Sequence, residues 1–164
     1  MRRVLGIDPG LNVSGYGVLD VEGDALRVLE AGVIRTKAGG SLQARLLELH
    51  DGIGEVFQSW SPTEMAIEEL YSHYERPRTA ILMGHARGVL CLAAGRFNVT
   101  LVHYAATQIK SALTGNGRAS KTQMQLAVQN HLGLAHVPEP PDLADALAVA
   151  ICHVYQSRAA AKLS

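Results

Sequence analysis

Val4-Leu5-Gly6-Ile7-Asp8-Pro9-Gly10, near the start of the chain, has the pattern of an apolar strand that runs into a tight turn. Two further segments rich in Val, Leu and Ile follow at residues 15–21 and 25–36, and the turn cluster Glu22-Gly23-Asp24 separates them. Connections this short favour consecutive antiparallel strands. The start of the chain therefore predicts a three-stranded antiparallel sheet.

The rest of the sequence alternates helical and strand patterns. Apolar residues recur at helical spacing from the N-cap Ser41 to Trp60, and residues 64–70 form a compact strand pattern. A strand reached through a long helix favours a right-handed crossover to a parallel neighbour. We therefore predict an α/β fold, in which helices flank a mixed five-stranded sheet of three antiparallel strands followed by parallel strands. The remaining predicted elements are a helix that begins at Pro77, a strand at 99–104, a helix with a capping box at Ser120 and Gln123 that ends at Gly133, and a last helix from Asp142 to about Ser157.

Length and composition predict one globular domain that spans residues 1–164. The chain has 48% apolar and 18% charged residues, which is ordinary for a folded protein, and we find no repeat or linker in it. No apolar run is long enough to span a bilayer, and Asp8 comes too early for a signal peptide. We therefore predict a cytoplasmic protein in which Cys91 and Cys152 are buried and reduced.

The formal net charge of the chain is zero. This balance is evidence against a globally basic protein that binds nucleic acid through its overall charge. Any contact with DNA must therefore arise from a local arrangement of positive groups.

Four acidic residues occupy positions where such a fold would bring them together. Asp8 ends the first strand and Glu68 lies near the end of the fourth, so in parallel neighbours both carboxylates emerge at the same edge of the sheet. Asp142 and Asp145 share one face at the start of the last helix. Convergent carboxylates repel one another strongly unless cations lie between them. The pattern predicts a site for hard divalent ions, Mg²⁺ above all, and two ions about 4 Å apart would serve phosphodiester hydrolysis.

Each of these acids also has a purely structural interpretation. Asp142 and Asp145 suit a helix N-terminus for capping and dipole reasons, and Asp8 before Pro-Gly is a common turn residue. Either Glu68 or Glu69 could face solvent, and alternation along the strand does not say which of them points toward Asp8. The metal site therefore depends on the joint placement of the four acids.

Short motifs along nearly the whole chain, from residue 3 to about 155, together resemble the RuvC family of Holliday junction resolvases in order and spacing. They are Leu5-Gly6-Ile7-Asp8-Pro9-Gly10 with Gly15-Tyr16-Gly17, Ala66-Ile67-Glu68, Ala86-Arg87-Gly88, Tyr104-Ala105-Ala106, and Asp142-Leu143-Ala144-Asp145-Ala146-Leu147-Ala148.

The resemblance implies an RNase H-like fold, a homodimer, and cleavage of four-way junction DNA by paired symmetric nicks that depend on Mg²⁺ or Mn²⁺. It also implies that Asp8, Glu68, Asp142 and Asp145 are the catalytic metal ligands, which favours Glu68 over Glu69. The RuvA and RuvB branch-migration complex becomes an expected partner.

Several residues are candidates for contact with DNA. Lys110, and Lys121 after the glycine-containing loop that carries Arg118, match lysines that the family uses on DNA. Arg76 lies beside a loop in which Tyr71 aligns with an aromatic residue that the family uses near the crossover, where a ring can stack on an exposed base. The alternatives are solvated surface charge for the lysines and a half-buried aromatic at a strand end for Tyr71.

Three other functions compete with a junction nuclease. Gly6-Ile7-Asp8-Pro9-Gly10 also opens actin-like phosphotransferases, but these need a second lobe and a second nucleotide-binding glycine motif. A related RNase H-like nuclease acting on RNA or other branched nucleic acid is the main alternative, and a junction-binding module without catalysis is the third. For the leading hypothesis, the smooth surface around Gly84 and Gly88 on a helix is the expected dimer contact.

Overall fold

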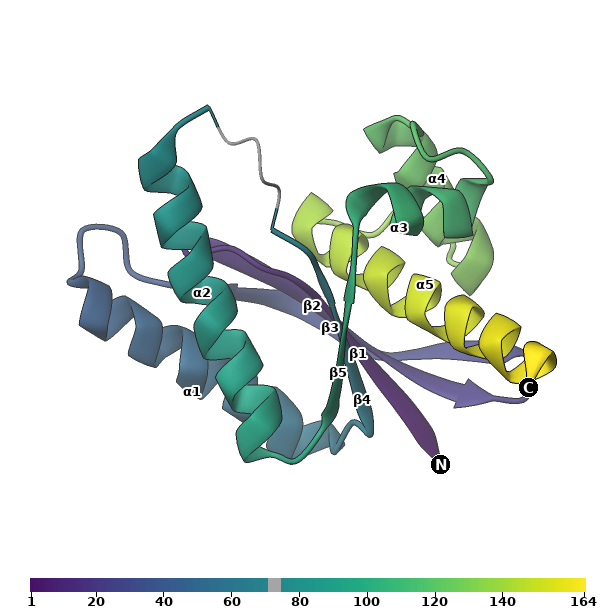
Figure 1. Cartoon of the computed structure of the whole chain (residues 1–164), viewed down its shortest axis with the longest axis horizontal. Coiled ribbons are helices and arrows are strands. Elements are labelled where there is room, and N and C mark those ends of the chain that lie inside the picture. The colour runs from purple at the N-terminus through teal and green to yellow at the C-terminus, as the bar shows by residue number, and fades with distance from the viewer. Residues whose placement is uncertain (71–74) are drawn as a thin grey trace.

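A mixed five-stranded sheet forms the centre of the computed structural model, which describes residues 1–70 and 75–164 (Figure 1). The strands lie in the order β3-β2-β1-β4-β5. β1 pairs antiparallel with β2, which pairs antiparallel with β3, whereas β1, β4 and β5 run parallel. This arrangement confirms the predicted sheet. The strand bounds are β1 Arg2–Asp8, β2 Val13–Glu22, β3 Ala25–Arg35, β4 Glu64–Glu68 and β5 Thr100–Tyr104.

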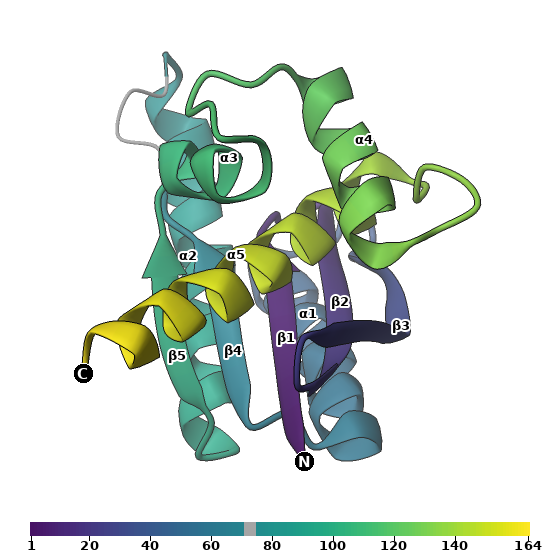
Figure 2. The same ribbon diagram turned by 90° about the vertical axis from the view of Figure 1, so that its right-hand side faces the viewer.

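Helices cover both faces of the sheet. α1 (Leu42–Trp60) and α2 (Pro77–Arg96) lie on one face, and α5 (Pro141–Leu163) crosses the other (Figures 1 and 2). The short helices α3 (Ala106–Thr114) and α4 (Lys121–Leu132) lie on the same side of the sheet as α5 and pack against it (Figures 1 and 2). Each face has its own apolar core, because successive strand residues point to opposite sides. Within the described segments, none of the helices combines the length and the apolar character that crossing a bilayer requires.

The predicted capping signals act as expected. The Ser41 hydroxyl accepts from the backbone N–H of Ala44, and Ser120 and Gln123 form a reciprocal capping box at the start of α4. Gly133 ends that helix in the left-handed conformation with φ 62°. These side chains satisfy N–H groups that the first turn of each helix leaves without partners.

Three details differ from the sequence prediction. The sequence indicated no helix at α3, which is only nine residues long and has Ala105, a residue without a side-chain oxygen, at its N-cap. α5 continues through Ala159-Ala160-Ala161 to Leu163 instead of ending near Ser157, because alanine has the highest helix propensity. Cys152 is buried as predicted, but Cys91 is only half-buried, so that part of the prediction was wrong.

Glycines let α5 lie directly against the sheet. A Cβ added at Gly6 would stand 2.2 Å from the carbonyl oxygen of Ala146 and 2.7 Å from the nitrogen of Ala150. One added at Gly15 would stand 1.9 Å from the carbonyl oxygen of Asp142. The helix backbone therefore occupies the space that side chains would take on β1 and β2. This close approach holds the acidic start of α5 over the ends of these strands.

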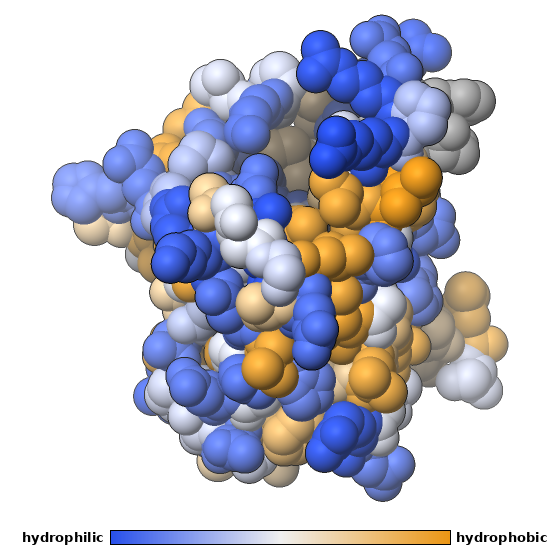
Figure 3. Space-filling model, turned by 90° about the vertical axis from the view of Figure 1, so that its left-hand side faces the viewer, coloured by the Kyte–Doolittle hydropathy of each residue, from blue (hydrophilic) through white to orange (hydrophobic). Residues whose placement is uncertain are grey.

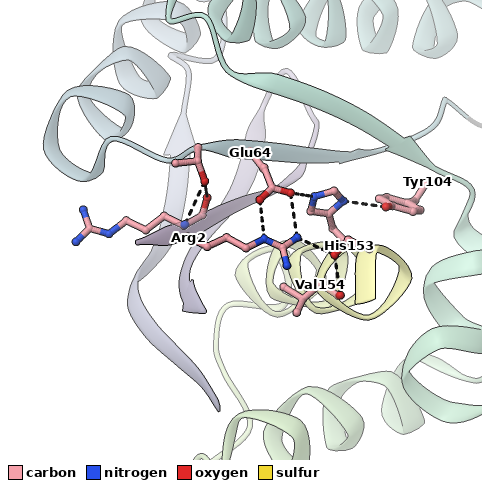
Figure 4. Close-up of polar contacts among 8 residues, drawn as sticks. Arg2, Glu64, Tyr104, His153 and Val154 are labelled. Carbon is pink, nitrogen blue, oxygen red and sulfur yellow. Dashed lines mark hydrogen bonds and ion pairs between the residues drawn. The ribbon is translucent and has the colours of Figure 1, made fainter. Parts of the chain in front are cut away.

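A partly buried polar network fixes α5 at the opposite end of the sheet (Figure 4). Nε2 of His153 lies 2.6 Å from a carboxylate oxygen of Glu64, and Nδ1 lies 2.8 Å from the hydroxyl of Tyr104. Arg2 donates to the other oxygen of Glu64 over 2.6 Å, and its hydrogen bond lowers the pKa of this carboxyl. Because the network links α5 with β1, β4 and β5, it sets the position of the helix along the sheet.

We expect Gly6→Ala to lower the free energy of unfolding by about 1–3 kcal/mol, because overpacking against a helix backbone forces the two layers apart. Gly54→Ala in α1 is the matched control, since a Cβ there meets no atom within 4 Å. Chemical denaturation measures both. Equal stability of the two variants would contradict the close-approach argument.

Candidate active site

Asp8 and Glu68 lie side by side at the C-terminal ends of two parallel strands. The pairing of β1 with β4 runs through Gly6 with Ala66 and Ile7 with Ile67, so Asp8 and Glu68 are the next residues in register. Gly6 and Ala66 face α5. Because side chains alternate along a strand, Asp8 and Glu68, two residues further on, face the same side of the sheet. Glu69 follows the end of β4 and is exposed. The geometry therefore favours Glu68, a choice that strand alternation left open.

The start of α5 brings the other two acids to the same place. Asp142 lies in the first turn of α5, and its backbone rests against Gly15, the residue that pairs with Asp8 on β2. Asp145 lies one turn further along, and its carboxylate is 3.9 Å from the Nζ of Lys121. Segments far apart in the sequence thus converge at one end of the sheet.

The negative charges of these acids affect one another's pKa. Burial, followed by the negative charges of Asp145, Glu68 and Asp142, raises the pKa of Asp8 to about 8. Burial and the charge of Asp145 also raise the pKa of Glu68. Burial raises the pKa of Asp145 as well, against the opposing effect of Lys121. A cluster of partly buried acids that raise one another's pKa is suited to a cation.

The carboxylates do not form a ready-made cage. Among the residues that the structure describes, no three His, Cys, Asp or Glu side chains are grouped closely enough to hold one metal ion. Mg²⁺ usually takes only one or two carboxylates from a protein and completes its octahedron with water and substrate phosphates. The all-oxygen donor set and the open spacing therefore fit Mg²⁺ held jointly by protein and phosphate better than an ion enclosed by protein alone.

Two pockets flank Glu68. The larger, of about 250 Å³, has an apolar floor and places Lys110 and Lys121 beside Glu68 and Asp145. The smaller, of about 90 Å³, has Asp8 and Glu68 on its wall together with Arg87. Both predicted lysines therefore lie at the acidic site.

The other predicted DNA contacts lie further out. Arg118 is exposed in the loop before α4, and Arg76 is exposed at the N-cap of α2. Neither residue lines the two pockets at Glu68. Tyr71 lies outside the described residues.

Arg87 is a residue of the site to which the sequence analysis gave no role. Its guanidinium donates to the backbone carbonyl of Glu68 and lies 2.8 Å from Nδ1 of His103. The only sequence signal for it was the motif Ala86-Arg87-Gly88. No local pattern connects this motif with the end of β4.

Comparison with known proteins decides the family. Residues 4–153 match the family model described as "Crossover junction endodeoxyribonuclease RuvC". The chain belongs to the RuvC family. The RuvC of Rhodopirellula baltica is 55% identical over 152 residues, which cover 93% of this chain and 85% of the relative. The RuvC of Alkaliphilus oremlandii is 42% identical and is covered to 92% of its length.

Solved RuvC structures share the fold. RuvC of Thermus thermophilus in complex with a Holliday junction substrate is 34% identical with a TM-score of 0.91, and the alignment covers 98% of this chain and 97% of that one. A yeast mitochondrial Holliday junction resolvase, 15% identical with a TM-score of 0.70 over 96% of this chain and 80% of that one, supports the fold alone. The predicted RNase H-like fold is confirmed.

We expect the stability of the metal-free protein to fall as the pH rises from about 4 to 8. The folded-state pKa of Asp8, about 8, lies above the ordinary value near 4, so the folded state binds more protons across this window. Asp8→Asn replaces the titrating carboxyl with a neutral amide. The metal-free variant should therefore be more stable than its parent at pH 8. Thermal unfolding in a chelator over this pH range measures the effect, and parallel pH curves for the two proteins would contradict it.

Proposed function

We propose that this RuvC-family chain is a nuclease of one domain that resolves Holliday junctions by paired symmetric nicks during recombination and DNA repair in the cytoplasm. The observation that carries the proposal is the electrostatic coupling of Asp8 with Glu68, Asp142 and Asp145, which come from separate segments of the chain. Partly buried acids that repel one another, at the end of a sheet beside lysines, suit metal-dependent hydrolysis of a phosphodiester.

Asp8, Glu68, Asp142 and Asp145 are the residues that would hold the metal. Two Mg²⁺ ions, with Mn²⁺ as a substitute, would supply an activated water and a positive charge at the leaving oxygen. The protein's part is to keep Asp8 and Glu68 adjacent on the sheet while α5 presents the two aspartates above them. Asp8 would have to be ionised for this role, and the acidic neighbours that help to raise its pKa would be its fellow ligands.

Positive groups around the site hold the DNA backbone. Lys110 and Lys121 share a pocket with Glu68 and Asp145, where they neutralise phosphates next to the cleaved bond. Arg118 and Arg76 extend this positive surface outward. The stacking role of Tyr71 at the crossover stays a prediction.

A second copy of the chain is the expected partner on α2. Residues of one side of α2 are exposed, and they include the large apolar side chains Ile81 and Leu92, 62% and 58% exposed. A Cβ added at Gly84 or Gly88 would meet no atom within 4 Å, so this surface is smooth. Apolar side chains gather on this side of the molecule (Figure 3). A two-fold dimer through α2 matches a substrate with two equivalent strands, and the RuvA and RuvB complex is a further proposed partner.

We expect Asp8→Asn and Glu68→Gln to reduce nicking of a synthetic mobile four-way junction by at least about 100-fold while junction binding persists, since they remove metal ligands. Glu22→Gln is the matched control and should cleave like its parent, because Glu22 is exposed at the other end of the sheet. Mapping nicks with and without Mg²⁺ tests the prediction. Equal loss of binding and cleavage would count against a metal-catalytic role, and preferential cleavage of structured RNA would favour the alternative nuclease.

We expect Leu92→Asp to convert the dimer into a monomer, because it buries a charge in an apolar interface. Leu126→Asp is the control, since Leu126 is an exposed leucine (48%) on another helix. Light scattering at micromolar concentration measures the mass. If both variants remain dimers, the proposed α2 interface is wrong.

A further inference from the structure

Arg87 connects three elements behind the acidic site. It extends from α2, between the buried residues Ala86 and Leu90, toward the ends of β4 and β5. One arm of its guanidinium donates to the carbonyl of Glu68, the last residue of β4. The other arm lies 2.8 Å from Nδ1 of His103, the β5 residue that pairs with Ile67. Its side chain therefore bridges α2 and two neighbouring strands.

The contacts of Arg87 differ from those of a simple counter-ion. In the part of the chain that the structure describes, no ion pair within 4.0 Å involves Arg87. Its guanidinium instead holds the main chain of Glu68, and its positive charge, with that of Lys110, opposes the rise that burial gives to the pKa of the Glu68 carboxyl. A planar guanidinium with a rigid fork of donors suits such a double contact, and a lysine ammonium does not reproduce it.

Glu68 is the last residue of β4, so the regular strand pairing does not hold its backbone on both sides along the chain. Glu69 donates its backbone N–H to the carbonyl of Tyr104 over 2.8 Å, and regular strand structure ends before it. The direction of the Glu68 side chain depends on the backbone at this strand end. The contact from Arg87 to the Glu68 carbonyl restrains that backbone.

We infer that Arg87 is a positioning residue, which holds the Glu68 main chain so that the Glu68 carboxylate stands beside Asp8 in the geometry that a divalent cation requires. The inference rests on the proposed function, in which Glu68 is a metal ligand. Groups that orient a ligand in this way commonly contribute about 10- to 100-fold to metal affinity or activity.

The test is a titration of Mn²⁺ into the DNA-free protein, followed by thermal unfolding. We expect Arg87→Gln to raise the Mn²⁺ concentration for the half-maximal thermal shift by about 10-fold or more, and to leave junction affinity in chelator within about twofold. Arg87→Lys keeps the charge but loses the fork, so we expect partial recovery. His103→Ala should shift the titration in the same direction by less, and its effect should not add fully to that of Arg87→Gln.

Arg96→Gln is the matched control, because Arg96 is an exposed arginine in the last turn of the same helix. Each variant is compared with its own metal-free unfolding midpoint, which separates loss of fold stability from loss of metal affinity. An unchanged Mn²⁺ titration for Arg87→Gln would overturn the inference, and weaker junction binding alone would identify Arg87 as a phosphate contact instead. If the parent protein itself shows no Mn²⁺-dependent shift, the proposed metal site fails together with the inference.

Discussion

The contact between the backbone of α5 and the glycines of β1 and β2 is the constraint on which the site depends. Gly6 and Gly15 leave no side chain between strand and helix, so the carbonyls of Ala146 and Asp142 lie where Cβ atoms would otherwise stand. A helix packed on a sheet through ordinary side chains would hold its N-terminus further from the strand ends. The close approach is what brings Asp142 and Asp145 within electrostatic range of Asp8.

The fold holds the four acids together although their negative charges repel one another. Burial and like charge raise the pKa of Asp8 to about 8, and the positive charge of Lys121 offsets only part of this effect. The stability that keeps such groups together comes from elsewhere in the fold. Two apolar cores enclose the sheet, and the network of Arg2, Glu64, His153 and Tyr104 fixes α5 at its other end (Figure 4). Such repulsion, held in place by a stable scaffold, is expected at a binding site that a cation completes.

The helix α2 combines two surfaces. Its exposed side carries Ile81 and Leu92 around smooth glycines, whereas its inner side packs Ala86 and Leu90 into the core. Arg87 lies between these sides and reaches the main chain of Glu68. The proposed dimer helix and the proposed metal site are therefore in direct contact through one side chain.

The sequence by itself determined the three antiparallel strands, the parallel strands after them, the caps at Ser41 and Ser120, and the positions of the four acids at element ends. These features follow from patterns within a few residues of each other, such as alternation, helical spacing and turn chemistry. The resemblance of the motifs already favoured Glu68 over Glu69, and the strand pairing places Glu68 next to Asp8 in register. Only the tertiary structure decided that α3 is a helix and that Arg87 reaches the end of β4. Each of these depends on the packing of segments that are distant in the chain, and local propensity carries no information about which distant atoms will be neighbours.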